Sequence, residues 1–226
     1  MGNLLMRRRE LILSGGSADP IDQYVQDGLI LWLDGIKNTR AGHSDTTTVW
    51  EDLSGNERDY TLYSTRVIGD KYIIPKGRAT SSQSITSGVS WTTEVCYLYG
   101  SSSKSQIFTP QRNTRNTLWI SAASNICVGA GGTSGNVKFV AQADHPTINT
   151  INSRYYINGR DDIEWSSGTG TWGTAQAQYL FGYNNATGYP MNCRVYALRI
   201  YDRTLTDEEI LQNYALDRIR FGSGVS

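Results

Sequence analysis

The 226-residue chain has few of the residues that build metal centres or disulfide frameworks: two histidines, three cysteines and five prolines. Cys96, Cys127 and Cys193 are odd in number and lack metal-ligand spacing, which argues against a zinc site and against a set of disulfides. Buried thiols in a reducing compartment are the simplest interpretation, and a Cys96–Cys193 or Cys127–Cys193 disulfide stays open. His43 and His145 lie in loop-like sequence, so a histidine-based catalytic triad is poorly supplied.

Excess charge and long apolar runs are also absent. Lys plus Arg and Asp plus Glu each number 21, so the formal net charge is zero, and we expect no nucleic-acid partner. The longest strongly apolar run, Leu29–Leu33, is too short to cross a bilayer, so we expect no membrane insertion. Residues 1–14 place their basic residues after a short apolar stretch, which is not the order of a secretory signal. We therefore expect a soluble protein that is not visibly exported.

What the sequence has is glycine, tyrosine and a series of short β-prone runs separated by turn signals, such as Asn158-Gly159. Both residues of that pair tolerate positive φ, which is typical of a two-residue hairpin. Many short strands at this spacing favour a sandwich or barrel. We predict strands at Leu29–Leu33, Thr61–Tyr63, Tyr72–Ile74, Trp91–Tyr99, Gln106–Thr109, Thr117–Ala122, Ile126–Gly129, Val137–Ala141, Tyr155–Asn158, Asp162–Trp165, Tyr179–Phe181 and Cys193–Tyr201.

The two ends of the chain differ from this pattern. Residues 1–18 are predicted to form an arm, and residues 19–226 a single domain that begins with a short helical turn ended by Gly28. Near the end, Thr206 and Glu209 have the spacing of a capping box at the start of a helix. We expect its apolar face to consist of Ile210, Leu211, Tyr214 and Ala215.

Four stretches, taken in order, resemble the concanavalin A-like lectin/glucanase superfamily in its laminin G-like branch, of the kind found in bacteriophage structural proteins. They are Asp27–Gly35, Thr48–Asn56, Tyr155–Arg160 and Val195–Ile210, the last with the Arg–Ile–Tyr and Leu–Thr–x–x–Glu elements typical of the family's ending. The resemblance implies an all-β fold: a two-sheet antiparallel jelly-roll sandwich, with a short N-terminal arm and one C-terminal helix. It does not fix a function, because this fold serves many.

Glycanases of this superfamily carry a Glu–x–Asp–x–x–Glu strand, whose carboxylates act as acid and nucleophile. The comparable cluster here places Asp162 and Glu164 on one face of a strand, but the first glutamate is missing. The cluster also follows the Asn158-Gly159 turn directly, so we interpret it as a solvated hairpin edge. We therefore predict that the chain is not an enzyme.

We expect no cofactor. Members of the superfamily often bind calcium in loops at a sandwich edge, and by that resemblance Asp34, Asp52 and Asn56 would supply oxygen ligands. The alternative is that Asp52 and Asn56 shape their turn by hydrogen bonds to the backbone.

Aromatic side chains are the candidates for glycan contacts. Trp32, Trp50 and Trp165 occupy apolar or motif positions and are predicted to be core residues. Arg199, in the last predicted strand, is expected to meet an acidic partner across the sheet. The predicted ligand-binding residues are Trp119, Tyr97, Tyr99, Tyr183 and Tyr189.

The predicted function is that of a virion structural protein: a phage head-fibre, capsid-decorating or tail-associated subunit that presents the jelly roll on the particle surface. Its partners would be other virion proteins or its own copies, as a homo-oligomer, and it would assemble in the host cytoplasm. The alternative is a bacterial carbohydrate-binding module or surface lectin at the cell surface; a glycoside hydrolase has the least support. The predicted anchoring residues are Arg7, Arg8, Arg9, Leu11, Ile12 and Leu13.

Overall fold

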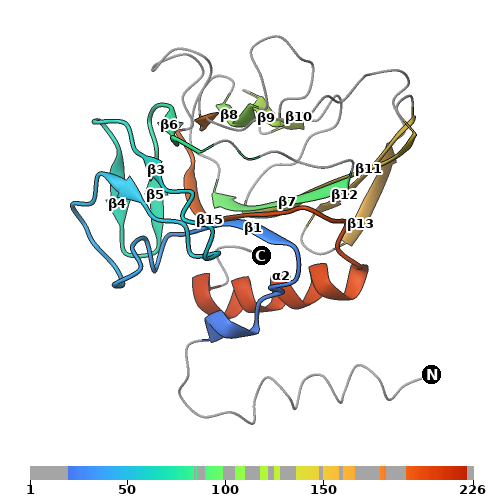
Figure 1. Ribbon diagram of the computed structural model, residues 1–226, viewed down its shortest axis with the longest axis horizontal. Coiled ribbons are helices and arrows are strands. Elements are labelled where there is room, and N and C mark those ends of the chain that lie inside the picture. Colours follow the sequence, from blue (N-terminus) through green and yellow to red (C-terminus); the bar gives the residue numbers. More distant parts are fainter. Residues whose placement is uncertain are drawn as a thin grey trace.

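A computed structural model describes residues 20–83, 85, 90–98 and 192–222, and the strand segments 105–109, 118–121, 125–127, 136–147, 150–157, 160–165 and 179–181. Within these residues the fold is two antiparallel sheets and one C-terminal helix, so the predicted all-β sandwich is confirmed. Figure 1 shows the sheets as two layers, with the helix on the outer face of the larger one. No helix of the described part is long and apolar enough to span a membrane.

The larger sheet has eight strands. In spatial order they are β13 (Arg160–Trp165), β12 (Thr150–Ile157), β11 (Asn136–Thr147), β7 (Ser90–Leu98), β15 (Arg194–Tyr201), β5 (Tyr72–Ile74) and β4 (Val67–Gly69), and β1 (Leu29–Asp34) also pairs with β15. The smaller sheet has seven strands. They are β10 (Asn125–Cys127), β9 (Leu118–Ser121), β8 (Ser105–Thr109), β14 (Tyr179–Leu180), β6 (Ala79–Thr80), β3 (Tyr60–Thr61) and β2 (Val49–Trp50).

The predicted strands all find counterparts, with ends that shift by a few residues. β12 and β13 pair at Ile157 and Arg160, on either side of the predicted Asn158-Gly159 hairpin. β2, β4 and β6 were not predicted, because runs of two or three residues are too short to show an alternating pattern. The predicted helical turn before Gly28 is the 3-10 helix η1 (Pro20–Gln23), and Gly28 has φ +75°.

β1 is buried on both faces, as its continuous apolar sequence predicts. Leu31 and Leu33 belong to the core between the sheets, together with the fully buried Trp50. Trp32 points the opposite way, into a second apolar cluster under the C-terminal helix that includes Ile210. Trp32 and Trp50 are therefore core residues, as predicted, while the side chain of Trp165 lies outside the described residues. Cys96 and Cys193 are buried thiols.

The helix α2 (Asp207–Phe221) begins with the predicted capping box. Thr206 Oγ1 accepts a hydrogen bond from Glu209 N at 3.3 Å, and Glu209 Oε2 accepts one from Thr206 N at 2.8 Å. Its predicted apolar face is wrong in part, because Leu211 is 47% exposed. The buried face mixes apolar and polar residues, since the sheet beneath it carries charged groups. It consists of Ile210, Asn213, Leu216, Asp217, Arg220 and Phe221.

Replacing Thr206 by alanine is expected to lower the free energy of unfolding by about 1 kcal/mol, the usual value of an N-cap.

The hydrogen bond from Arg203 holds the pKa of Glu209 below its ordinary value. A lowered folded-state pKa means that this stabilisation is present above the pKa of an unfolded glutamate, about 4.3, and is lost as the pH falls below it. Urea denaturation at pH 7 and pH 3 measures both effects. A Thr206→Ala protein as stable as wild type at pH 7 would contradict the role of the cap.

Candidate ligand-binding site

The edge of β1 opposite β15 is covered by the loop that follows β2. Trp32 N donates a hydrogen bond to Asp52 Oδ1 at 2.9 Å, and Leu53 N donates one to Trp32 O at 2.8 Å. Arg58 Nη1 donates to Ile30 O at 2.6 Å. The loop thus satisfies backbone groups that an edge strand would otherwise leave exposed. It is held by hydrogen bonds to both the N–H and the C=O of Trp32.

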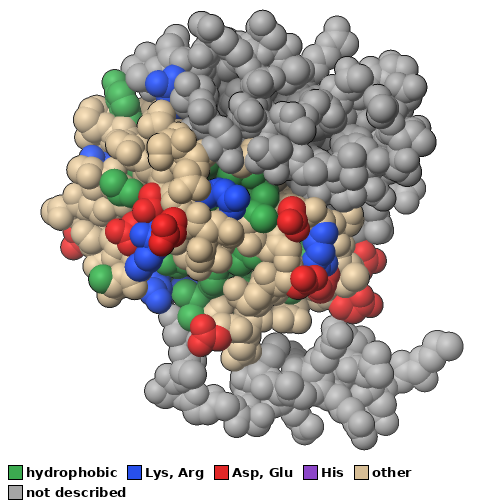
Figure 2. Space-filling view, in the orientation of Figure 1, with side chains coloured by type: hydrophobic (Ala, Val, Ile, Leu, Met, Phe, Trp, Pro, Cys, Tyr) green, Lys and Arg blue, Asp and Glu red, His purple; other side chains and the backbone are tan. Residues whose placement is uncertain are grey.

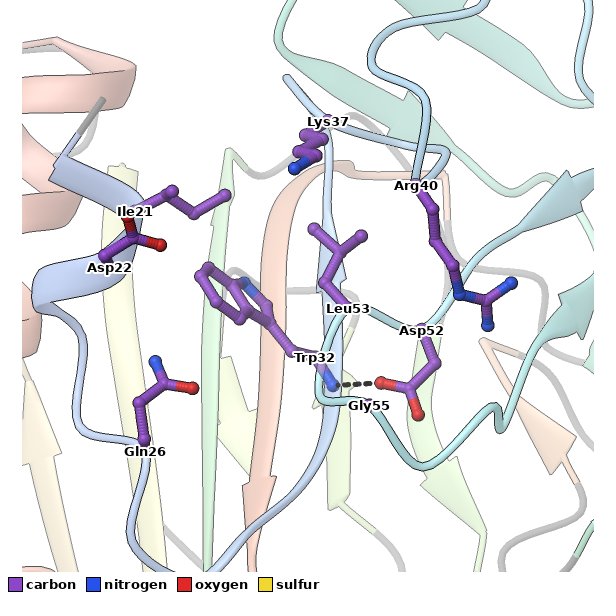
Figure 3. Close-up of a pocket in the computed structure, with 9 residues that line it drawn as sticks. All are labelled: Ile21, Asp22, Gln26, Trp32, Lys37, Arg40, Asp52, Leu53 and Gly55. Atoms are coloured by element: carbon purple, nitrogen blue, oxygen red, sulfur yellow. Dashed lines mark hydrogen bonds between the residues drawn. The ribbon is translucent and has the colours of Figure 1, made fainter. Parts of the chain in front are cut away.

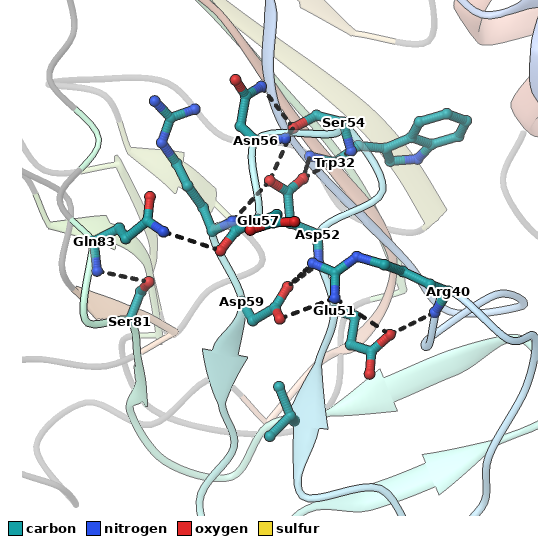
Figure 4. A network of polar contacts seen from close by, with 12 residues as sticks. Trp32, Arg40, Glu51, Asp52, Ser54, Asn56, Glu57, Asp59, Ser81 and Gln83 are labelled. Carbon is teal, nitrogen blue, oxygen red and sulfur yellow. Dashed lines mark hydrogen bonds and ion pairs between the residues drawn. The ribbon is translucent and has the colours of Figure 1, made fainter.

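Asp52 organises this loop and is fully buried. Its Oδ1 accepts hydrogen bonds from Trp32 N and Ser54 N, each at 2.9 Å. Its Oδ2 accepts from Ser54 Oγ at 2.8 Å and from Arg58 N at 3.1 Å. Figure 4 shows the carboxylate at the centre of these contacts. A carboxylate that accepts four hydrogen bonds makes a rigid support for the pocket that the loop lines.

A pocket of about 420 Å³ lies between this loop, β1 and the segment around η1. Figure 3 shows its walls: η1 and the residues after it on one side, the turn after β1 and the loop of Asp52 on the other, and the indole of Trp32 between them. The lining residues are Ile21, Asp22, Gln26, Trp32, Lys37, Arg40, Asp52, Leu53 and Gly55.

The indole of Trp32 is held in place but keeps an unused donor. The ring is 4% exposed and packs edge-on against Tyr24, with 5.2 Å between ring centroids. Its Nε1 is buried and has no hydrogen-bond acceptor among the described residues. A buried donor without an acceptor costs about 1–3 kcal/mol, and at a pocket wall a ligand oxygen recovers that energy.

Two cations line the pocket, and they differ in what they already bind. The Arg40 guanidinium binds the Asp59 carboxylate through both terminal nitrogens and lies 3.7 Å from Glu51. The hydrogen bonds that Arg40 donates to the Asp59 carboxylate raise the pKa of Arg40 above its ordinary value. Lys37 is fixed through its backbone, since its N–H donates to Asp34 Oδ1 at 2.9 Å. Its half-buried side chain has no ion-pair or hydrogen-bond partner within the described part of the chain.

The opposite wall supplies acceptors. Asp22 and Gln26 are exposed at the rim, and Gln26 Nε2 donates to Tyr24 O at 3.0 Å, which leaves its amide oxygen available to a ligand. Asp22 carries a carboxylate on the same side (Figure 3). The pocket thus combines hydrogen-bond donors on one wall with acceptors on the other. A ligand with hydroxyl groups satisfies both, because a hydroxyl both donates and accepts.

One predicted ligand-binding residue is placed in the core. Tyr97 is 1% exposed and belongs to the cluster between the sheets, so its predicted contact with a ligand is wrong. The reason is that β7 is a central strand, covered by the smaller sheet on one face and by α2 on the other. Trp119 lies on β9, where its backbone pairs with Gln106 and Cys127, but its side chain is outside the described residues.

The remaining predicted contacts also lie outside the described residues. These are Tyr99, Tyr183 and Tyr189, and the anchoring residues Arg7, Arg8, Arg9, Leu11, Ile12 and Leu13. Sequence reasoning missed the Trp32 pocket, because a tryptophan within an apolar strand indicates a core residue, which Trp32 also is.

Two of the three residues that the resemblance offers as calcium ligands, Asp34 and Asp52, already accept hydrogen bonds from protein donors. Asp34 Oδ1 accepts from Ile36 N and Lys37 N, and the Asp34 carboxylate pairs with Arg220. The Asp52 oxygens accept hydrogen bonds from backbone N–H groups of its own loop, so Asp52 shapes its turn as the alternative to calcium binding predicts. In the described part of the chain, no group of three or more His, Cys, Asp or Glu is placed to hold a metal ion. The carboxylates of Asp34 and Asp52 do not fit calcium as they stand. The absence of a cofactor stays a prediction.

No family model and no curated protein sequence matches this chain. The fold resembles that of part of a sialidase chain. Trypanosoma rangeli sialidase in complex with 2,3-difluorosialic acid superposes with a TM-score of 0.60 at 14% identity, over 94% of this chain and 36% of that one. The binding domain of botulinum neurotoxin DC in complex with SialylT gives 0.50 at 13% identity, over 85% and 52%. This chain therefore spans about a third of the sialidase chains it resembles.

This likeness corrects one prediction. The prediction that the chain is not an enzyme is contradicted, because sialidases, which are enzymes, are among the proteins whose folds are similar to it. At 14% identity the likeness shows the fold alone, so it assigns no catalytic residue here. It does support the lectin-like sandwich that the four sequence stretches imply.

Proposed function

We propose that this chain is a lectin-like domain that binds a glycan in the pocket beside Trp32. One observation carries the proposal: Trp32 lines the pocket, and its Nε1–H is buried and has no acceptor among the described residues. Native proteins satisfy nearly all buried polar groups, so an unused donor on a side chain that lines a pocket favours a ligand that supplies the acceptor.

The rest of the pocket suits a sugar. Its volume of about 420 Å³ is within the range of small-molecule sites, about 300–1,000 Å³. Polar groups line both walls, while Ile21 and Leu53 offer apolar surface for the C–H faces of a ring. The loop of Asp52 is already fixed by four hydrogen bonds. A preformed loop lowers the entropy cost of binding. This matters for a sugar, because a sugar gains little from the burial of apolar surface.

The structural neighbours support the same class of ligand. Among them are Trypanosoma rangeli sialidase in complex with sialic acid and the botulinum neurotoxin DC binding domain in complex with SialylT. Both proteins contain this fold, and both are seen with sialic acid or a sialyl compound. The proposal concerns binding by the described domain.

Trp32→Phe tests this proposal, because it keeps an aromatic ring in place and removes the N–H. We expect affinity for a glycan identified on an array to fall about tenfold, which corresponds to one lost hydrogen bond of about 1.4 kcal/mol. Isothermal titration calorimetry measures the change. The matched control is Trp50→Phe, whose lost Nε1–H donates to Asp34 O in the core at 2.9 Å, away from the pocket.

The control variant is expected to lose stability but, while folded, to bind the glycan as wild type does. An array on which the wild-type protein binds no glycan would contradict the proposed function. Equal losses of affinity in both variants would contradict the assignment of the Trp32 pocket.

For the setting of this activity we keep the proposal made from the sequence: the surface of a bacteriophage particle, or alternatively of a bacterial cell. A glycan-binding domain in either setting would meet cell-surface glycans, and its own copies or other virion proteins would be its partners. Mass spectrometry of purified particles tests the first setting.

Figure 2 shows acidic and basic side chains intermixed on the described face, without a patch of one sign.

A further inference from the structure

We infer that the Trp32 pocket selects an acidic saccharide, whose carboxylate is bound by the Trp32 Nε1–H and the Lys37 ammonium. This inference rests on the proposed glycan binding and adds the charge of the ligand. Both residues line the pocket, the side chain of each carries a hydrogen-bond donor, and Figure 3 shows the two side chains among those that enclose the pocket. A carboxylate accepts from both at once, because its two oxygens offer several lone pairs.

Two of the charged residues that line the pocket, Arg40 and Asp52, already bind other protein groups. The charged residues that remain favour an acidic ligand. Arg40 is neutralised by Asp59 and Glu51. The oxygens of Asp52 accept hydrogen bonds from three backbone N–H groups and the Ser54 hydroxyl. The charged groups of the lining that remain are the exposed Asp22 at the rim and the half-buried Lys37. Of these two residues Lys37 is the more buried, so the charge that a ligand meets deeper in the pocket is positive.

Lys37 is placed to use that charge on a ligand. Its N–H is fixed by Asp34 Oδ1, at the turn that follows β1, and Asp34 is itself held by Arg220. The position of the Lys37 backbone is thus set, while the four-carbon stem gives the ammonium freedom to meet the ligand. The Lys37 ammonium is partly buried and has no counter-ion within the ranges that the structure describes, so it has lost some of its hydration, and an incoming carboxylate compensates for that loss.

The other wall explains why the ligand is a sugar acid and not a simple anion. Asp22 would repel an anion that filled the whole pocket, and the amide oxygen of Gln26 offers an acceptor beside it. Hydroxyl or amide N–H groups at the far end of the ligand would donate to both. The pocket thus has one end for an acidic group and one end for hydroxyls.

The experiment compares oligosaccharides that end in a uronic or sialic acid with the same oligosaccharides after reduction of the carboxyl group to an alcohol. Calorimetry on the full chain is expected to show at least tenfold tighter binding of the acidic form. Lys37→Met is expected to remove that preference and leave affinity for the reduced form unchanged. Lys37→Gln serves as a second variant, and Lys76→Met is the matched control, an exposed lysine that does not line the pocket.

The outcomes separate the two proposals. If wild-type protein binds both forms equally and the Lys37 variants bind as wild type does, the acidic selectivity is overturned. The glycan-binding proposal then still stands, provided that Trp32→Phe weakens binding. If the protein binds neither form nor any other glycan, both proposals fall. A loss of the preference in Lys76→Met as large as in Lys37→Met would also overturn the assignment of Lys37.

Discussion

Replacing Arg199 by methionine is expected to lower the free energy of unfolding by about 3–5 kcal/mol, the cost of breaking a buried ion pair by removing one partner. Arg199 is buried between β15 and α2. Its Nε donates to Glu94 Oε2 at 2.8 Å and its Nη2 to Asp217 Oδ2 at 2.6 Å. Both carboxylates are themselves buried, so the substitution would leave two negative charges away from water.

The cluster around Arg199 joins strands to the helix. Asn213 Nδ2 donates to Glu94 Oε2 at 2.9 Å, and Tyr24 Oη donates to Asp217 Oδ1 at 2.8 Å. The guanidinium carbon of Arg199 lies 4.3 Å from the centroid of the Tyr24 ring. Burial opposes the charge of Arg199, but Asp217 and Glu94 more than offset it, so the pKa of Arg199 is raised well above its ordinary value. The two carboxylates therefore stabilise the charged form of the guanidinium.

The control for this experiment is Arg40→Met. Arg40 also pairs with carboxylates, but its side chain is 44% exposed, so its loss should cost no more than about 1 kcal/mol. Urea denaturation of the two variants measures the difference. If Arg199→Met is no less stable than Arg40→Met, the cluster does not hold α2 on the sheet. Adding Glu94→Gln and Asp217→Asn to Arg199→Met should restore part of the loss, since no unpaired charge remains.

The same cluster shows how far the sequence predicts this fold. The acidic partner expected across the sheet from Arg199 is confirmed as Glu94, because the two residues are opposite each other on β15 and β7. The capping box predicted the start of α2 correctly. The buried face of α2 was not predictable from periodicity, because Asn213 and Asp217 are buried to satisfy Arg199 and Glu94, and a polar residue in a helix normally indicates a solvated position.

The candidate site was less predictable than the fold. Its pocket is built by three segments, around η1, after β1 and after β2, and their meeting depends on how a loop covers the edge of β1. The sequence indicates that Asp52 lies in a turn, but not that its carboxylate reaches back twenty residues to the Trp32 backbone. Long-range contacts of this kind depend on tertiary packing. Periodicity and local motifs therefore predicted the sheets and α2 but not the pocket.

Asp52→Ala is expected to have the second largest effect, lowering the free energy of unfolding by about 3–4 kcal/mol. The substitution removes the acceptor of three backbone N–H groups, those of Trp32, Ser54 and Arg58, and a buried donor left without an acceptor costs about 1–3 kcal/mol. Water that enters the loosened loop recovers part of this cost, so the expected total is below the sum. Thermal and urea denaturation measure it.

Two further variants make the result specific. Asp52→Asn retains one oxygen acceptor at this position, so it is expected to lose about half as much stability as Asp52→Ala. Asp22→Ala removes an exposed carboxylate from the same pocket and should change stability by no more than about 0.5 kcal/mol. Because Asp52 fixes the loop that carries Leu53, folded Asp52→Ala protein should also bind the glycan more weakly. If Asp52→Ala is as stable as Asp22→Ala, the loop does not depend on this carboxylate, and the preformed pocket loses its physical basis.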